Sequence, residues 1–211
     1  MDTIIQILAR ELGRSEAHVE NVVRLIDEGN TIPFIARYRK ELHGAMDDTA
    51  LRTLADRLQY LRNLDKRREE VKSAIEGQGK LTEELSAAID AAATLAEVED
   101  LYRPYKQKRR TRATVAREKG LEPLAELLFA QAADGPAPEE AAGAFIDPEK
   151  GVETAEDALQ GASDIIAERI SDDADIRKRL RELGWKKGSL FSAAAAKEPE
   201  DTVYRLYYAF R

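Results

Sequence analysis

The longest stretch without proline or glycine includes all of 49–76, and this region constrains the fold more than any other feature of the sequence. Its apolar residues recur at spacings of three and four, which is the period of one face of an α-helix. These residues are Leu51, Leu54, Leu58, Leu61, Leu64, Val71 and Ile75. A strict heptad would place Asp65 and Arg68 in the apolar seam, so the stripe shifts partway along. We therefore predict one long helix over about 49–76 that packs within the chain rather than as an extended coiled coil.

Shorter amphipathic segments precede and follow this helix. A helix hairpin is predicted over 3–29, because Gly13 separates two apolar-periodic segments and Ser15 is a suitable N-cap. The second of these helices carries four acidic residues, so a plain hairpin is favoured over a DNA-reading helix-turn-helix. Aromatic residues make up only 6% of the chain. Helix formers dominate instead, and the predicted class is an all-α, multi-helix region.

The C-terminal part changes character. We predict one helical domain over 1–184, with Gly184 ending the last helix, Leu127 and Phe129 buried, and a linker at 132–136. Residues 185–211 are expected to connect to a following domain, with a short extended piece near 189–195. Aromatic and aliphatic side chains concentrate in 203–210, where they either pack on the core or remain exposed.

Composition excludes several classes of function. The 211 residues include no cysteine and only two histidines, so neither thiolate chemistry nor a multi-histidine metal site is possible. No nucleophile, phosphate-loop or dinucleotide motif occurs, and we expect no catalytic residue, no metal, no cofactor and no small-molecule substrate. His18 and His43 are expected to be surface or helix-end residues. Helix capping and the preference of a first helical turn for negative charge explain the pairs Asp47-Asp48 and Asp172-Asp173 more simply than metal binding does. Without a signal peptide or a membrane span, the expected location is the cytoplasm.

Eight basic residues fall within a basic segment, 102–120, which contains Glu118 as its one acid. We predict a loop over 102–113 and take six of these cations as candidate nucleic-acid contacts: Arg103, Lys106, Lys108, Arg109, Arg110 and Arg112. The stretch 121–176 holds fifteen acidic residues against two basic ones. Internal pairing with these acids is therefore an equal alternative to phosphate contact.

A second cationic group lies in a short helix that begins at Thr31-Ile32-Pro33. Its Phe34, Ile35 and Tyr38 have the appearance of core residues. Three further candidate contacts alternate with them or follow them: Arg37, Arg39 and Lys40. These cations are expected either to be exposed or to pair with acids of the long helix.

The run from Thr31 to Glu41, TIPFIARYRKE, followed by a glycine and the pair Asp47-Asp48, resembles a signature of the Tex family. A second similar stretch runs from Glu97 to Leu124 and includes EDLYRPYK, KRRTRAT and AREKGLEPL. The Tex family comprises bacterial transcription accessory proteins related to a eukaryotic elongation factor, and its members are several times longer. The resemblance covers their N-terminal helical region, without the RNase H-like domain, the helix-hairpin-helix repeats or the OB-type RNA-binding domain.

The resemblance implies a transcription accessory protein whose full-length form binds RNA or DNA, mainly through its C-terminal domain, and it transfers no catalytic residue. The expected role of this chain is that of an N-terminal scaffold, with nucleic acid as partner. The alternative is a purely structural module that docks the transcription machinery and has no nucleic-acid affinity of its own.

Overall fold

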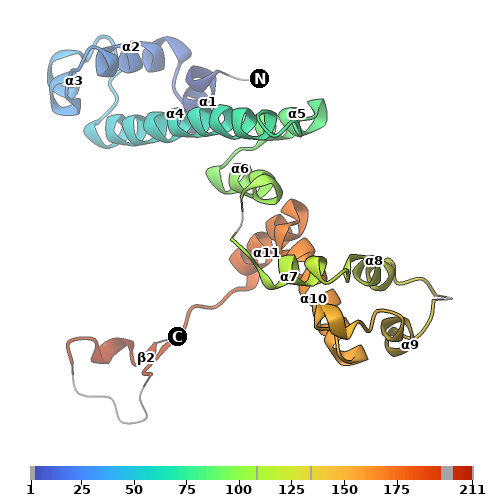
Figure 1. Cartoon of the computed structure of the whole chain (residues 1–211). Helices are drawn as coiled ribbons and strands as arrows, with labels where there is room; N and C mark the ends of the chain where they lie inside the picture. Colours follow the sequence, from blue (N-terminus) through green and yellow to red (C-terminus); the bar gives the residue numbers. More distant parts are fainter. Residues whose placement is uncertain (1–2, 108, 134, 196–201, 211) are drawn as a thin grey trace. The chain divides into compact units, whose positions relative to one another are not determined.

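The computed structural model describes residues 3–107, 109–133, 135–195 and 202–210. Within these ranges the chain forms eleven α-helices and two strands of two residues each, which confirms the predicted all-α class (Figure 1). The chain divides into two compact units, Met1–Val98 and Glu99–Arg211, and the division falls within α6 (Leu95–Tyr102). Each unit is described by itself.

The first unit is built on the long helix. Its helices are α1 (Ile4–Leu12), α2 (Glu16–Asp27), α3 (Ile32–Tyr38), α4 (Asp48–Glu76) and α5 (Glu83–Ala91). Figure 1 shows α1, α2 and α3 on one side of α4, and all three contact it. All seven apolar residues of the predicted stripe are buried, so the long helix and its shifted stripe are confirmed.

Local signals in the sequence determine where these helices begin. Thr3 forms a capping box with Gln6, and Ser15 accepts a hydrogen bond from the backbone of His18. Gly13, with φ of 61°, ends α1 in the left-handed conformation that glycine adopts without strain. Asp47 caps α4 by accepting a 2.7 Å hydrogen bond from the Ala50 amide. The predicted hairpin over 3–29 is therefore confirmed.

The segment after α4 is fixed to α4 by side chains. The Arg68 guanidinium donates to the Ala92 carbonyl at 2.7 Å, and the Lys72 ammonium lies 2.9 Å from the Asp90 carboxylate. The Tyr60 hydroxyl accepts a hydrogen bond from the Leu95 amide at 3.2 Å. These contacts hold the end of α5 and the start of α6 against α4.

The second unit is built around one central helix. Its elements after α6 are η1 (Arg103–Tyr105), α7 (Arg112–Glu118), α8 (Glu122–Ala130), α9 (Pro138–Gly143), η2 (Pro148–Lys150), α10 (Ala155–Asp172) and α11 (Ala174–Lys187). Helices α7, α8 and α9 all pack on α10. Gly161 of α10 permits this packing, because a Cβ there would lie 2.3 Å from Cδ1 of Leu121.

Several sequence expectations for this unit were wrong. Helix α9 was not predicted, and the expected linker at 132–136 joins two helices of the same unit; Asp134 lies outside the described residues. Helix α11 continues through Gly184 to Lys187, because glycine lowers helix stability without forbidding the helical conformation. Leu127 and Phe129, expected to be buried, are 41% and 40% exposed, since α8 is covered by neighbours on only one face.

The C-terminal part forms a small hairpin. Strand β1 (Ser192–Ala193) pairs antiparallel with β2 (Ala209–Phe210), and η3 (Arg205–Tyr207) precedes β2. The extended piece predicted near 189–195 is thus present. Of the two alternatives for the apolar side chains of 203–210, exposure is observed, with Val203 88% exposed and Leu206 86% exposed. None of the described helices is long and apolar enough to span a membrane.

Candidate nucleic-acid interface

The basic segment is more ordered than the predicted loop. Residues 103–105 form η1, and α7 begins at Arg112, where helix was expected only from Thr114. The Thr111 side chain caps this helix by accepting a 3.1 Å hydrogen bond from the Thr114 amide. Arg112 consequently lies in the first helical turn rather than in a loop.

Most candidate contacts of this segment lie beside carboxylates of their own unit. The nitrogen–oxygen distances are 3.0 Å for Arg103 with Asp172, 3.9 Å for Lys106 with Glu99, 2.6 Å for Arg110 with Glu118 and 3.6 Å for Arg112 with Asp164. Arg109 makes no hydrogen bond or ion pair with any residue that the structure describes. Lys108 lies outside the described residues. Internal pairing, left open by the sequence, is therefore the observed arrangement for four of the six candidates.

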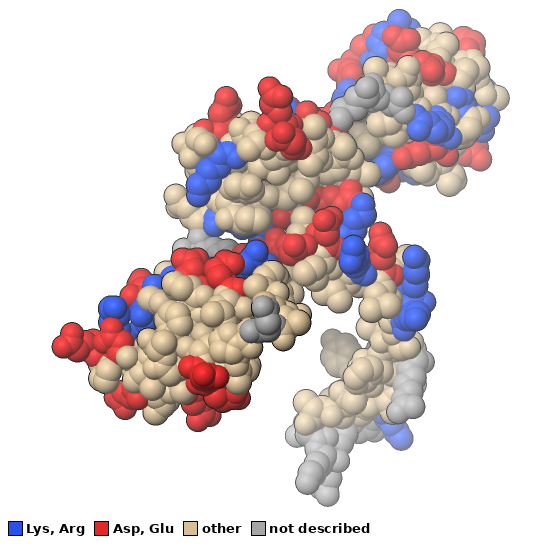
Figure 2. Space-filling model, turned by 90° about the vertical axis from the view of Figure 1, so that its right-hand side faces the viewer, with Lys and Arg blue, Asp and Glu red and all other residues tan. Residues whose placement is uncertain are grey.

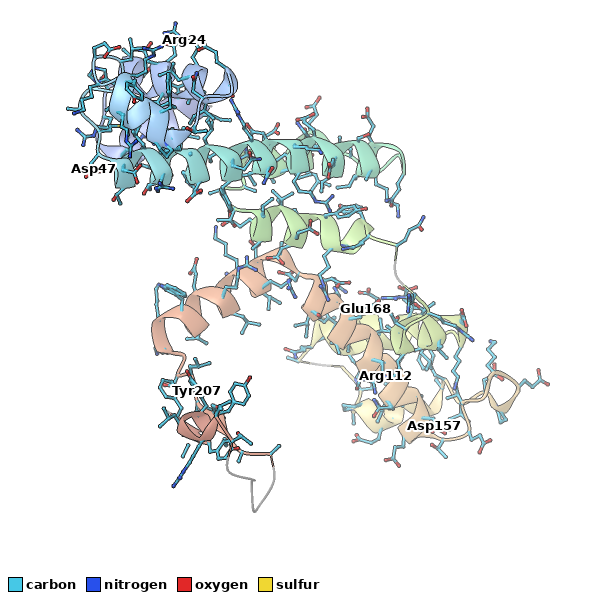
Figure 3. All side chains as sticks on the ribbon, turned by 90° about the vertical axis from the view of Figure 1, so that its left-hand side faces the viewer. Arg24, Asp47, Arg112, Asp157, Glu168 and Tyr207 are labelled. Atoms are coloured by element: carbon cyan, nitrogen blue, oxygen red, sulfur yellow. The ribbon has the colours of Figure 1, made fainter. Side chains whose placement is uncertain are left out.

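The acceptors lie mainly on α10. Glu168 accepts hydrogen bonds from the Thr111 hydroxyl at 3.0 Å and from the Arg117 guanidinium at 2.8 Å. The hydrogen bond to Glu168 raises the pKa of Arg117 above its ordinary value. Figure 3 shows Arg112 of α7 between Glu168 and Asp157 of α10. The acidic face of α10 thus neutralises one side of the basic segment.

The sequence analysis missed a second set of basic residues, on α11. This helix contains Arg177, Lys178, Arg179, Arg181, Lys186 and Lys187. Two of them, Arg177 and Arg181, lie one helical turn apart and both donate to the carboxylate of Asp100, which is only 4% exposed. The i, i+4 spacing of two arginines was the available signal.

These contacts explain the charged residues of the EDLYRPYK stretch. Asp100 is bound by two arginines of α11, and three residues later Arg103 is bound by Asp172, the last residue of α10. Asp173 then caps α11 by accepting a 2.8 Å hydrogen bond from the Ile176 amide. We call this set of contacts the charge lock: Asp100 with Arg177 and Arg181, and Arg103 with Asp172. It holds the start of the second unit against α10 and α11.

Helix α3 presents a different environment for its cations. Its inner face consists of Ile32, Ile35 and Ala36, which pack against the core formed with α4. Tyr38 is 62% exposed and Phe34 is half-buried, so the expectation that both are core residues was wrong for Tyr38. The helical period is consistent with this result, because Phe34 and Tyr38 lie one turn apart and both fall to one side of the face that Ile32, Ile35 and Ala36 form together.

The cations in and just after this helix are exposed at Arg37 and Lys40 and half-buried at Arg39. Arg37 and Lys40 make no ion pair with any residue in the part of the chain that the structure describes. The Arg39 guanidinium lies 5.3 Å from the centre of the Phe34 ring and donates to the Tyr38 carbonyl at 3.3 Å. The Phe34 and Tyr38 rings lie 5.3 Å apart at an angle of 46°. We call Phe34, Arg37, Tyr38, Arg39 and Lys40 the α3 surface.

The face of the molecule seen in Figure 2 carries mixed charge. Figure 2 shows basic and acidic side chains interspersed over the visible face, without one continuous basic field. This distribution agrees with the formal net charge of −7 and argues against coating of nucleic acid by the whole surface.

The acidic and histidine side chains are the remaining candidates for a metal or catalytic site. The described residues contain no cluster of three or more acidic or histidine side chains able to hold a metal ion. His43 is 1% exposed, and neither ring nitrogen has a hydrogen-bond partner among the described residues, so its expected surface position was wrong. It occupies a turn where Gly44 has φ of 58° and the His18 ring takes the space of a Cβ.

The regions that match known families include the first of the two stretches that resemble the Tex family, from Thr31 to Glu41, whereas the second, from Glu97 to Leu124, lies between the two matched regions. The family model of the Tex-like protein N-terminal domain matches residues 2–76, and that of the Tex central region-like domain matches residues 134–211. The chain belongs to the Tex family. The first match contains all of α1 to α4, and the second contains α9 to α11.

Named Tex proteins are similar along almost the whole chain. "Protein tex" of Bordetella pertussis is 48% identical over 98% of the chain, and "Transcriptional accessory protein Tex" of Neisseria gonorrhoeae is 42% identical over 97%. The human "S1 RNA-binding domain-containing protein 1" is 32% identical over 92% of the chain. The chain spans 26%, 27% and 19% of the lengths of these three relatives, respectively.

Proposed function

We propose that this chain is the non-catalytic helical scaffold region of a transcription accessory protein that acts on nucleic acid, and that the α3 surface makes its own phosphate contacts. The relatives support the first part, since one is named a transcriptional accessory protein and another an S1 RNA-binding domain-containing protein. The observation that carries the second part is the contrast in pairing: the α3 cations lack carboxylate partners among the described residues, whereas most of the basic segment has them.

A cation without a carboxylate partner binds a phosphate more strongly than a cation that is already paired. A phosphate that approaches Arg103 competes with Asp172, whereas one that approaches Arg37 or Lys40 displaces only water and small ions. The pairs of Arg110 and Arg112 are exposed and therefore weak, so these residues and Arg109 contribute secondary contacts. The expected binding is independent of sequence and falls with salt.

The test is a salt titration of binding by fluorescence anisotropy, with labelled single-stranded RNA and duplex DNA. The triple variant Arg37→Ala/Arg39→Ala/Lys40→Ala is compared with Arg109→Ala/Arg110→Ala/Arg112→Ala, which removes three cations from the basic segment. We expect the α3 variant to lose most of the affinity and about two to three units of the salt slope. The basic-segment variant is the matched control and retains most of the binding.

A purely structural, protein-docking function is the second candidate, and one observation favours it. Helix α11 has no buried residue, and its Leu180 and Leu183 are 61% and 51% exposed. An unpartnered apolar stripe of this kind suits contact with another protein segment. Absence of nucleic-acid binding by the wild-type chain at low salt would reject the phosphate contacts and leave this function.

A further inference from the structure

We propose that the α3 surface binds single-stranded nucleic acid by stacking an unpaired base on Tyr38, and therefore discriminates against duplex. This inference rests on the proposed phosphate contacts of α3 and adds the class of strand that is bound. It depends on the placement of one aromatic ring among cations.

The Tyr38 side chain is available for a ligand. The residue is 62% exposed, and its hydroxyl makes no hydrogen bond with any described residue. The core contacts of the helix are made instead by Ile32, Ile35 and Ala36. Tyr38 is thus free to contribute an open aromatic face without any change in the packing of the first unit.

The ring is also held in a defined position. Thr31 caps α3 by accepting a hydrogen bond from the Phe34 amide, and Ile35 anchors the helix with no exposed surface. The half-buried Phe34 ring lies 5.3 Å from Tyr38 and supports one side of it. A platform fixed before binding loses less conformational entropy when a base stacks on it.

The surrounding charges fit a strand that passes over this platform. Arg37 precedes Tyr38, and Arg39 and Lys40 follow it after the helix ends at Tyr38. Cations immediately before and after an aromatic residue in the sequence suit a single strand, in which bases alternate with phosphates. In a duplex the bases are already stacked on one another, so the ring of Tyr38 cannot reach a base face and only the phosphate contacts remain.

The experiment measures the affinity of the full chain for three probes of equal length. They are a labelled 12-nucleotide oligo-dT, the corresponding abasic sugar–phosphate strand and a 12-base-pair duplex. For Tyr38→Ala we expect about a tenfold weaker affinity for oligo-dT, which corresponds to one stacked base, and no change for the abasic strand. The matched control Tyr38→Phe keeps the ring and is expected to bind within about twofold of wild type.

The two proposals fail in different ways. Equal affinity of the wild-type chain for all three probes, with no effect of Tyr38→Ala on oligo-dT, overturns stacking but leaves the phosphate contacts intact. No binding of any probe at low salt overturns both. An equal loss for oligo-dT and the abasic strand in Tyr38→Ala also overturns stacking, because a lost ring face cannot alter a strand that has no bases. Unchanged thermal unfolding of Tyr38→Ala would exclude a folding defect as the cause.

Discussion

The basic segment and the α3 surface contain the same kinds of side chain in opposite surroundings. In the basic segment, Arg103 and Arg110 lie within hydrogen-bonding distance of carboxylates, and Arg117 lies 2.8 Å from Glu168. In α3, the apolar residues pack on the core, and the cations of the α3 surface lie near two aromatic rings instead of carboxylates. A high density of cations along a sequence therefore does not show how many of them are available to a ligand. Acidic residues that are distant in the sequence can pair with these cations in the folded chain.

The largest expected effect comes from breaking the charge lock. Asp100→Ala leaves Arg177 and Arg181 without their shared acceptor, and we expect the second unit to lose about 2 kcal/mol of unfolding free energy. Urea unfolding followed by circular dichroism measures this loss. Asp100→Asn, which keeps one acceptor oxygen, is expected to lose less, and equal stability of Asp100→Ala and wild type would contradict a structural role.

A smaller loss is expected where α7 meets α10. Glu168→Ala removes the acceptor of both Thr111 and Arg117, and because Glu168 is mostly buried we expect a loss of about 1–2 kcal/mol. Glu168→Gln, which keeps the shape and one acceptor, serves as the control in the same urea experiment. A higher unfolding free energy for Glu168→Ala would show that the contacts of Glu168 with Thr111 and Arg117 do not stabilise the fold.

The outer pairs of the basic segment should matter less. The Arg110–Glu118 and Arg112–Asp164 pairs involve arginines that are 69% and 86% exposed, so we expect Arg110→Ala/Arg112→Ala to lower the unfolding free energy by less than about 1 kcal/mol. The same unfolding titration provides the comparison. A loss as large as that of Asp100→Ala would mean that these exposed pairs are as important as the charge lock.

The α3 triple variant should be the most nearly neutral of the charge changes. Arg37, Arg39 and Lys40 make no ion pair among the described residues, and we expect Arg37→Ala/Arg39→Ala/Lys40→Ala to change the unfolding free energy by less than about 0.5 kcal/mol. Loss of nucleic-acid binding with retained stability would separate function from folding at this surface. Unfolding of this variant at ordinary temperature would place the α3 cations among the structural residues instead.

A pH-dependent effect concerns the ion pairs that the first unit does contain. Hydrogen bonds from Arg57 and Arg62 lower the pKa of Glu11 and Asp27, respectively, below their ordinary values. A lowered folded-state pKa contributes stability that is present above the ordinary carboxyl range and is lost as the pH falls through the lowered value. We expect Glu11→Gln/Asp27→Asn to melt a few degrees lower than wild type at pH 7 and to approach it near pH 3. If the difference in melting temperature between the variant and the wild type stayed the same in acid, these ion pairs would not be its source.

Sequence periodicity predicted the parts of the fold that depend on local patterns. The shifted stripe of α4, the glycine at the end of α1 and the caps at Ser15 and Asp47 follow from spacing and side-chain chemistry alone. The short α9 escaped prediction because alanine and acidic residues between prolines lack a clear apolar period. The exposure of Tyr38 was missed because an aromatic residue near aliphatic ones suggests a core until the neighbouring helices are placed.

The candidate site was less predictable than the fold for a physical reason. Whether Arg103 or Arg37 is free depends on acids that are distant in sequence, such as Asp172, 69 residues from Arg103. No local pattern encodes this pairing. The arginines of α11 were overlooked because their acceptor, Asp100, lies 77 residues before Arg177.

The most direct test of the central claim locates the bound strand on the chain. A single-stranded oligonucleotide carrying a photoreactive 5-iodouracil is cross-linked to the wild-type chain in low salt, and the modified peptide is identified by mass spectrometry. We predict cross-linking at Tyr38, within the α3 surface. Cross-links confined to the basic segment, residues 102–120, would contradict the account, because they would show that paired cations bind the strand in preference to the exposed ones.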